Sequence, residues 1–196
     1  TDNQVVSKSV VDPETLVRTT TYENVDGNYN FGISGNYSKE IRIDTLKKVK
    51  FNLRTRFNRS RNINFNNDVQ YASTVNTISP RLGVDFYWEK VMEIRPFYEL
   101  NISNNAYDID AFEDINFISH NAGLRTATFL PKKFEWRNDI NFNYNPNVAE
   151  GFQKSAWFWN STLTYSLLKD KGLITLKVYD LLNQNTNARR IATQDY

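Results

Sequence analysis

The residue types that most often do chemistry are scarce in this sequence of 196 residues and are poorly spaced for it. His120 is the only histidine, and no motif supplies the nucleophile or base that a catalytic histidine needs. Glu93 and Glu99 fall on one face of an expected strand, but six strand residues separate them by about 20 Å, too far for paired acid–base catalysis. We therefore expect His120 to be structural and predict that the chain is not an enzyme.

Metal binding is not indicated either. The sequence has no cysteine, which excludes disulfides, cysteine-ligated zinc and thiol catalysis. Asp108, Asp110, Glu113 and Asp114 have the carboxylate oxygens that Ca²⁺ takes, but their spacing matches no calcium loop. A solvated acidic loop is the favoured interpretation, and we predict no metal ion and no cofactor.

The charge balance limits the partners. The sequence has 24 Lys and Arg against 22 Asp and Glu, a formal net charge of +2. A nucleic-acid-binding protein usually gathers a basic excess on one face, so we expect no nucleic-acid partner. Many charged residues instead alternate with apolar ones, and this alternation predicts the elements that position them.

Alternation in residues 157–179, in two arms about a glycine-containing turn, predicts a β-hairpin. Trp157, Leu163 and Tyr165 fall on one face of its first arm, and small or polar residues fall on the other. A charged, glycine-containing turn at 169–172 leads to a second arm, in which Ile174 belongs to the apolar face. One face of the hairpin is therefore apolar and the other polar.

The rest of the chain repeats this pattern, rich in aromatic and β-branched residues, with no helical segment. We predict a single all-β domain over residues 1–196, with about ten long, meandering, antiparallel strands. The other strands are expected at residues 4–11, 16–38, 48–65, 71–88, 92–104, 122–130, 134–144 and 190–196. Asp26-Gly27 also suits a hairpin turn, but one strand over 16–38 is preferred because the alternation passes through Gly27 without slipping.

Connections and tryptophans are both unevenly distributed. Short charged turns at 89–90, 131–133 and 169–172 alternate with longer loops at 105–114, 145–151 and 181–189. An outer-membrane barrel has short periplasmic turns and longer external loops. The four tryptophans fall near strand ends, where interfacial aromatic girdles lie, and we expect them to be interface residues: Trp88, Trp136, Trp157 and Trp159.

Alternation alone does not say whether the apolar face meets lipid or a protein core. A soluble β-barrel also alternates, and a soluble barrel that binds a small apolar ligand in its interior is the alternative. The expected strands often exceed the roughly 9–11 residues of a spanning strand, whereas globular strands average about 5–6. No run of about 18 apolar residues forms a transmembrane helix. We therefore favour an antiparallel transmembrane β-barrel.

Two short pieces are distinctive, KVYDLLNQN at 177–185 and TQDY at 193–196. They resemble the C-terminal barrel region of Bacteroidetes outer-membrane β-barrel proteins of the TonB-dependent receptor type. Weaker matches at 29–37, 78–83 and 159–161 extend the resemblance over nearly the whole chain. It implies location in the cell outer membrane and a receptor and transport role in nutrient uptake. It also implies a barrel of about 22 strands.

The sequence departs from this family in two ways. It contains no plug domain or TonB-contacting segment, and the last strand of the barrel is absent after Tyr196. About ten strands of a larger sheet leave two open edges, which lipid does not tolerate. We therefore expect a fragment of a larger barrel, which in the full-length protein has a plug domain and TonB-type energy coupling as partners.

If the apolar face meets lipid, the polar face points into the lumen. Its expected lumen-facing charged residues are Arg54, Arg56, Arg95, Glu99, Arg125, Arg137 and Asp139. They either pair across strands, meet the plug or line a solvated wall. Arg59 and Arg61 fall in the lipid-side register, and we predict that they contact lipopolysaccharide phosphates, the alternative being a strand that protrudes into water. Membrane lipid and lipopolysaccharide are thus the expected partners.

Overall fold

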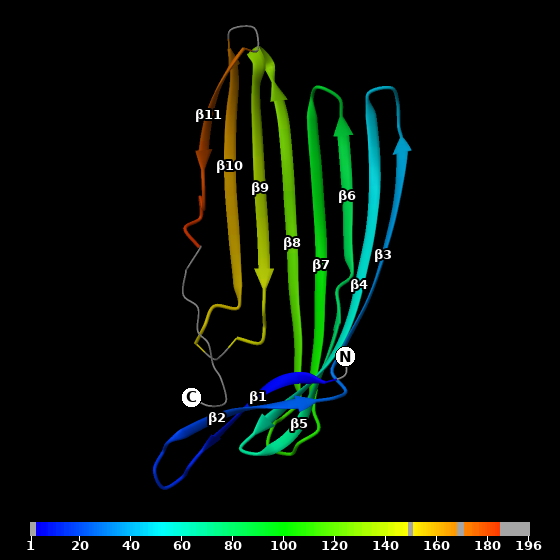
Figure 1. The fold of residues 1–196 in the computed structure, drawn as a ribbon. Coiled ribbons are helices and arrows are strands. Elements are labelled where there is room, and N and C mark those ends of the chain that lie inside the picture. Colours follow the sequence, from blue (N-terminus) through cyan, green and yellow to red (C-terminus); the bar gives the residue numbers. More distant parts are fainter. Residues whose placement is uncertain (1–2, 149–150, 168–170, 185–196) are drawn as a thin grey trace. The chain divides into compact units, whose positions relative to one another are not determined.

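The computed structural model describes residues 3–148, 151–167 and 171–184 (Figure 1). This part is all-β, its sheets are mostly antiparallel, and it contains one 3₁₀ turn, η1 (Pro131–Lys133). The strands are β1 (Gln4–Val11), β2 (Arg18–Val25), β3 (Tyr29–Arg42), β4 (Lys47–Asn66), β5 (Val69–Ile78), β6 (Arg81–Trp88), β7 (Met92–Tyr107), β8 (Ile115–Leu130), β9 (Phe134–Tyr144), β10 (Ser155–Leu167) and β11 (Gly172–Val178). The predicted all-β, antiparallel class is confirmed. No helix in the described ranges is long and apolar enough to cross a membrane.

The chain divides into two compact units that share several long strands. Unit 1 comprises Thr1–Tyr37, Leu53–Arg81 and Glu99–Ser119, and unit 2 comprises Ser38–Asn52, Leu82–Tyr98 and the chain from His120. Strands β1 and β2 form a separate hairpin. The larger sheet has the order β11-β10-β9-β8-β7-β5-β4-β3, and β6 pairs with β4 and β7. Neighbouring strands β7 to β10 can be followed side by side in Figure 1.

The strand register brings the apolar residues of unit 2 onto a common face. Tyr165 of β10 lies opposite Phe134 of β9 and Ile174 of β11. Trp157 lies opposite Phe142, and their rings are 4.7 Å apart. Because side chains alternate between faces, all neighbours in this register project to the same side. The two-faced hairpin that the sequence predicts therefore continues into β9 and β8.

The preferred single strand over residues 16–38 is wrong. The chain breaks at residues 26–28 into β2, which pairs with β1, and β3, which belongs to the larger sheet. Gly27 has φ +92°, a conformation that residues with a side chain rarely adopt, and a Cβ there would lie 2.9 Å from Nη1 of Arg61. The alternation of apolar and polar residues has the same phase before and after the break, so the sequence pattern does not reveal the break.

The predicted strand 71–88 is also two strands, β5 and β6, separated by Ser79 and Pro80. Pro80 has no N–H to donate, but its carbonyl accepts from the amide of Leu100 at 3.0 Å. Ser79 and Arg56 exchange backbone hydrogen bonds of 2.8 and 3.3 Å. Strand pairing therefore continues across the break.

The predicted turns match the structure better than the predicted strand boundaries do. Asn67 and Asp68 join β4 to β5 with φ values of 43° and 70°, the two positive values of a type I′ hairpin turn. The predicted turns at 89–90 and 131–133 likewise connect strands. The predicted strand at 190–196, and residues 169–170 of the predicted charged turn, lie outside the described residues.

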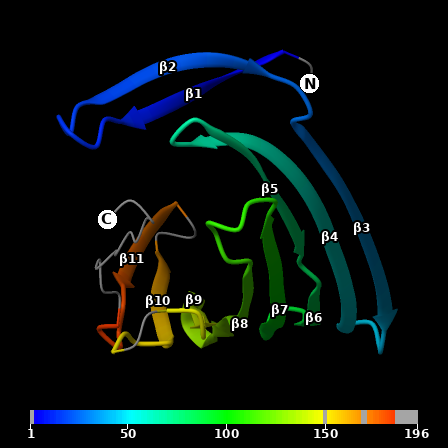
Figure 2. The same ribbon diagram turned by 90° about the horizontal axis from the view of Figure 1, so that it is seen from below.

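The small apolar core of unit 1 lies where the β1–β2 hairpin meets the tip of the β4–β5 hairpin (Figure 2). Val25, Ile63 and Ala72 are buried there, and Val6 and Phe65 pack against them. The nearby side chain of Asn28 is 5% exposed, and its amide oxygen accepts the backbone N–H of Ile63. The Asn28 amide nitrogen donates to Gln4 at 2.9 Å, so this buried polar group is satisfied.

The β1–β2 turn gives a testable pH dependence. The carboxylate of Asp12 accepts backbone hydrogen bonds from Glu14 at 2.8 Å and Thr15 at 3.1 Å. The bonds from Thr15 and then Glu14 hold the pKa of Asp12 below its ordinary value of 3.8. Because the folded pKa is lowered, the turn's stabilisation is complete above pH 3.8 and is lost as the pH falls through the lowered value.

An NMR titration of the Asp12 carboxyl should therefore give a pKa below 3.8 in the folded chain. In Asp12→Ala, the amide resonances of Glu14 and Thr15 should lose the pH-dependent shift that accompanies this titration. A pKa at or above the ordinary value would contradict the turn geometry.

Candidate functional site

Charged residues from neighbouring strands of unit 1 line one small cavity of about 180 Å³. Its lining residues are Arg54, Arg56, Ser79, Arg81, Glu99 and Asn101. The sequence predicted a shared face for Arg54, Arg56 and Glu99, and the structure brings these three together. It adds Arg81, Ser79 and Asn101, which the sequence analysis missed.

Positive charge is in excess in this cavity, which we call the arginine cavity. Nη1 of Arg81 lies 3.2 Å from Oε2 of Glu99, the only carboxylate in the lining. Arg54 and Arg56 are exposed, and within the described part of the chain neither guanidinium has an ion-pair or hydrogen-bond partner. Three guanidinium groups therefore share one carboxylate, a composition that favours anions.

A second charged cavity, of about 430 Å³, lies in unit 2, and we call it balanced because each of the three arginines in its lining pairs with a carboxylate. Nε of Arg125 on β8 lies 3.4 Å from Oδ2 of Asp139, directly opposite on β9. Arg95 pairs with Glu93 on β7, and Arg137 lies on the same wall. Arg137 pairs with Glu135 on β9. Only the pair of Arg125 and Asp139 joins two strands, and the other two pairs lie within one strand. That this wall faces a lumen stays a prediction.

Two of the four tryptophans, Trp136 and Trp157, are exposed, and two, Trp136 and Trp159, have a hydrogen-bonded indole N–H. The indole N–H of Trp136 donates to Ser161 at 2.8 Å, and that of Trp159 donates to Asn138 at 3.0 Å. Nζ of Lys47 lies 4.6 Å from the ring centroid of Trp88, the last residue of β6. An apolar ring with a satisfied polar edge suits a membrane interface. The interface role of the tryptophans nevertheless stays a prediction.

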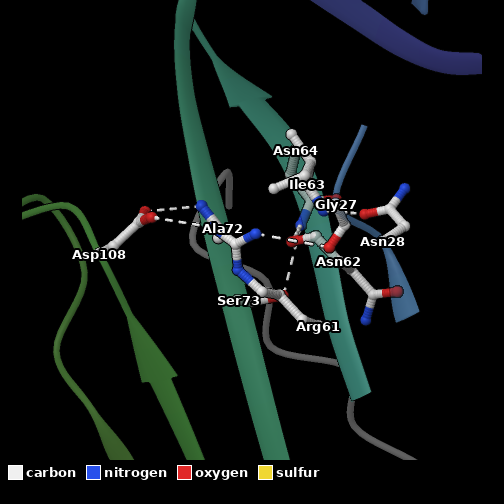
Figure 3. Close-up of polar contacts among 9 residues, drawn as sticks. All are labelled: Gly27, Asn28, Arg61, Asn62, Ile63, Asn64, Ala72, Ser73 and Asp108. Carbon is white, nitrogen blue, oxygen red and sulfur yellow. Dashed lines mark hydrogen bonds and ion pairs between the residues drawn. The ribbon is translucent and has the colours of Figure 1, made fainter. Parts of the chain in front are cut away.

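Arg59 and Arg61, the predicted lipopolysaccharide contacts, both have partners in unit 1. Nε of Arg59 donates to the hydroxyl of Tyr29 at 3.0 Å. Nη1 of Arg61 donates to the carbonyl of Gly27 at 3.4 Å, and Nη2 lies 4.0 Å from Oδ2 of Asp108 (Figure 3). Lipopolysaccharide contact stays a prediction for both residues.

His120 and the acidic loop have structural partners. Nδ1 of His120 lies 2.6 Å from the Tyr98 hydroxyl, and its ring lies beside Tyr98 and Tyr144. In the acidic loop, Asp108 accepts from the amide of Ala72 at 2.6 Å (Figure 3), and Asp114 accepts from the amide of Tyr107 at 3.0 Å. Among the residues that the structure describes, no group of three or more His, Cys, Asp or Glu is placed to hold a metal ion.

The apolar face of β9 to β11 is left exposed. Trp136 is 42% exposed, Trp157 46%, Ile174 62% and Leu176 61%. The opposite face of the same strands carries the pairs around Asp139 and Glu135. Across the described residues, the buried apolar side chains are only Val25, Ile63, Ala72 and Ala127. The apolar residues of this sheet thus face outward while its charges share the other side.

Comparisons of the chain with protein-family models, with curated proteins and with solved structures give no match. The resemblance to TonB-dependent receptors therefore stays a prediction from the sequence. Two features of the molecule bear on its function, the two unlike faces of the sheet and the arginine cavity.

Proposed function

We propose that the chain is a segment of an outer-membrane β-barrel, part of a TonB-dependent receptor-like channel for nutrient uptake. In this function the apolar face meets lipid in the cell outer membrane, and the charged face lines a water-filled lumen. A plug domain and TonB-type energy coupling belong to the full-length protein. The chain itself has no catalytic role.

The exposed apolar face is the observation that carries this proposal. Full burial of one large apolar side chain stabilises a fold by roughly 1.5–3 kcal/mol. A continuous apolar face that stays in water therefore loses a large stabilising free energy. Soluble monomers rarely expose contiguous apolar patches of this kind. The neighbouring positions of Trp136, Leu163 and Leu176 across three strands make such a patch. Lipid tails remove this cost, whereas the paired charges need water.

Strand length supports the same function. β4 has 20 residues, and β7 and β8 have 16 each, whereas a tilted strand crosses the bilayer core with about 9–11 residues. The excess length suits strands that continue beyond the bilayer. At the tip of the β4–β5 hairpin, Ile63 is covered by protein, as expected of a part that extends into water.

The soluble alternative needs an enclosed apolar interior to hold a small apolar ligand. The few buried apolar side chains of the described part do not build one, because three of them cluster under the β1–β2 hairpin. The charged lining of the arginine cavity is also unsuited to such a ligand. A cavity of about 980 Å³ in unit 2 has Leu46, Trp88 and Phe129 in its lining, but several lysines and glutamates share that lining, so it is not an enclosed apolar interior.

Cell fractionation tests the proposal. We expect the native protein in the outer-membrane fraction, soluble only with detergent, and with a faster electrophoretic mobility before boiling than after it. A periplasmic protein serves as the control for lysis. Recovery as a detergent-free soluble monomer would overturn the proposed location and the lipid contact together.

A further inference from the structure

We propose that the arginine cavity binds a phosphate group through the guanidinium groups of Arg54, Arg56 and Arg81. This deepens the proposed function, because a phosphate site on a lumen wall gives the transported solute a chemical class. Only that transport role rests on the proposed function. The binding itself depends on residues of unit 1 alone.

The cavity has the donor set of a phosphate site. Arginine presents a planar fork of donors that matches two phosphate oxygens, and Ser79 and Asn101 add neutral donors in the same lining. These groups come from β4, the β5–β6 connection, the first residue of β6 and β7, and backbone hydrogen bonds through Ser79 and Pro80 tie the connection to β4 and β7. The backbone therefore fixes the spacing between the donors.

The charge of the cavity selects the class of anion. Three arginines against Glu99 leave an excess of two positive charges, which matches a phosphate dianion. Glu99 is 3.2 Å from Arg81 and competes with an incoming anion for that guanidinium. Arg54 and Arg56, which are exposed and have no ion-pair partner among the described residues, can engage phosphate without breaking a salt bridge.

The balanced cavity of unit 2 is the internal comparison. Arg95, Arg125 and Arg137 there each have a carboxylate partner. An anion would have to displace those carboxylates, so arginine content alone does not make a site. The excess of charge, and not the number of arginines, distinguishes the arginine cavity.

Titration of the purified protein in detergent with inorganic phosphate, followed by calorimetry and by ³¹P line broadening, tests the proposal. We expect saturable binding that weakens about tenfold in Arg56→Gln, because a charge-assisted hydrogen bond is lost. Arg56→Lys keeps the charge but loses the fork, and should also weaken binding. Glu99→Gln releases Arg81 and should tighten binding several-fold.

Two controls match the lost charge. Arg18→Gln removes a positive charge from β2 of the same unit, outside the lining of the arginine cavity, and Arg125→Gln removes one from the balanced cavity of unit 2. Neither should change the phosphate affinity by more than about twofold. Glycerol phosphate as a second titrant separates free phosphate from the phosphate ester of a larger solute: tighter binding of the ester identifies the ester as the better ligand.

Absence of saturable phosphate binding, or equal weakening by Arg56→Gln and Arg18→Gln, would overturn the proposal. An unchanged affinity in Glu99→Gln would do so as well. Fractionation reports on the membrane function separately. Outer-membrane protein without phosphate affinity refutes the site alone, and soluble protein that still binds phosphate refutes the membrane function alone.

Discussion

Under the proposed membrane function, Leu163→Arg should destabilise the protein in a bilayer by about 2–4 kcal/mol, the typical cost of a cation that faces lipid near the middle of a barrel. Leu163 lies in the interior of β10 between Trp136 of β9 and Leu176 of β11. All three side chains belong to the exposed apolar face. The guanidinium would enter hydrocarbon there with no carboxylate beside it.

Thr164→Arg is the matched control because it places the same side chain one residue along the strand, on the opposite face. Thr164 lies opposite Glu135 on β9 and Thr175 on β11, so an arginine there has an acidic neighbour. We expect its free energy of unfolding to stay within about 1 kcal/mol of that of the parent protein. Urea unfolding in lipid vesicles, followed by tryptophan fluorescence, measures both variants.

The comparison between the two variants distinguishes lipid from water on the apolar face. In water an arginine at a partly exposed strand position costs little, so equal and small effects for both variants would contradict the lipid contact. A large effect of Thr164→Arg alone would reverse the assignment of the faces.

The fold class follows from the sequence because alternation is a local property. The alternation within each strand shows which of its residues share a face. The register between strands then joins the apolar faces of neighbouring strands into one surface, as at Tyr165, Phe134 and Ile174. Strand breaks are different, because they depend on backbone conformation at one or two residues. Gly27 and Pro80 interrupt strands, yet the residues on either side keep their alternation.

The site could be predicted only in part for a similar reason. Alternation of polar and apolar residues within each strand was enough to place Arg54, Arg56 and Glu99 on the polar face. Arg81 was missed because the sequence does not give the register between β6 and β7, and only that register pairs it with Glu99. The burial of Ile63 depends on Val25 of a different hairpin, a packing contact that alternation cannot encode.

Gly123→Ala should lower the free energy of unfolding by about 1–3 kcal/mol, the usual cost of overpacking. A Cβ at this position would lie 2.3 and 2.5 Å from Cε1 and Cζ of Phe97, and 2.9 Å from Oδ1 of Asn141. The Phe97 ring therefore covers the glycine, as aromatic residues do over glycines in neighbouring strands. The methyl group would displace the ring from that contact.

Gly83→Ala is the matched control on an adjoining strand of unit 2. A Cβ there meets its nearest atoms, in Asn52, Pro96 and Phe97, at 3.8–3.9 Å, which is ordinary van der Waals contact. This variant should be neutral or slightly stabilising, since alanine reduces the freedom of the unfolded chain. Urea unfolding in lipid vesicles should therefore show a loss of stability for Gly123→Ala and no loss for Gly83→Ala.

A double-mutant cycle isolates the cause of the Gly123 effect. If the cost arises from the displaced ring, Gly123→Ala should cost less in a Phe97→Ala background than in the parent protein, because no ring remains to clash. Additive effects of the two substitutions would show that Gly123 acts through backbone freedom instead. The coupling between them therefore tests whether the Phe97 ring holds β7 against β8, the strand that carries Arg125 of the charged wall.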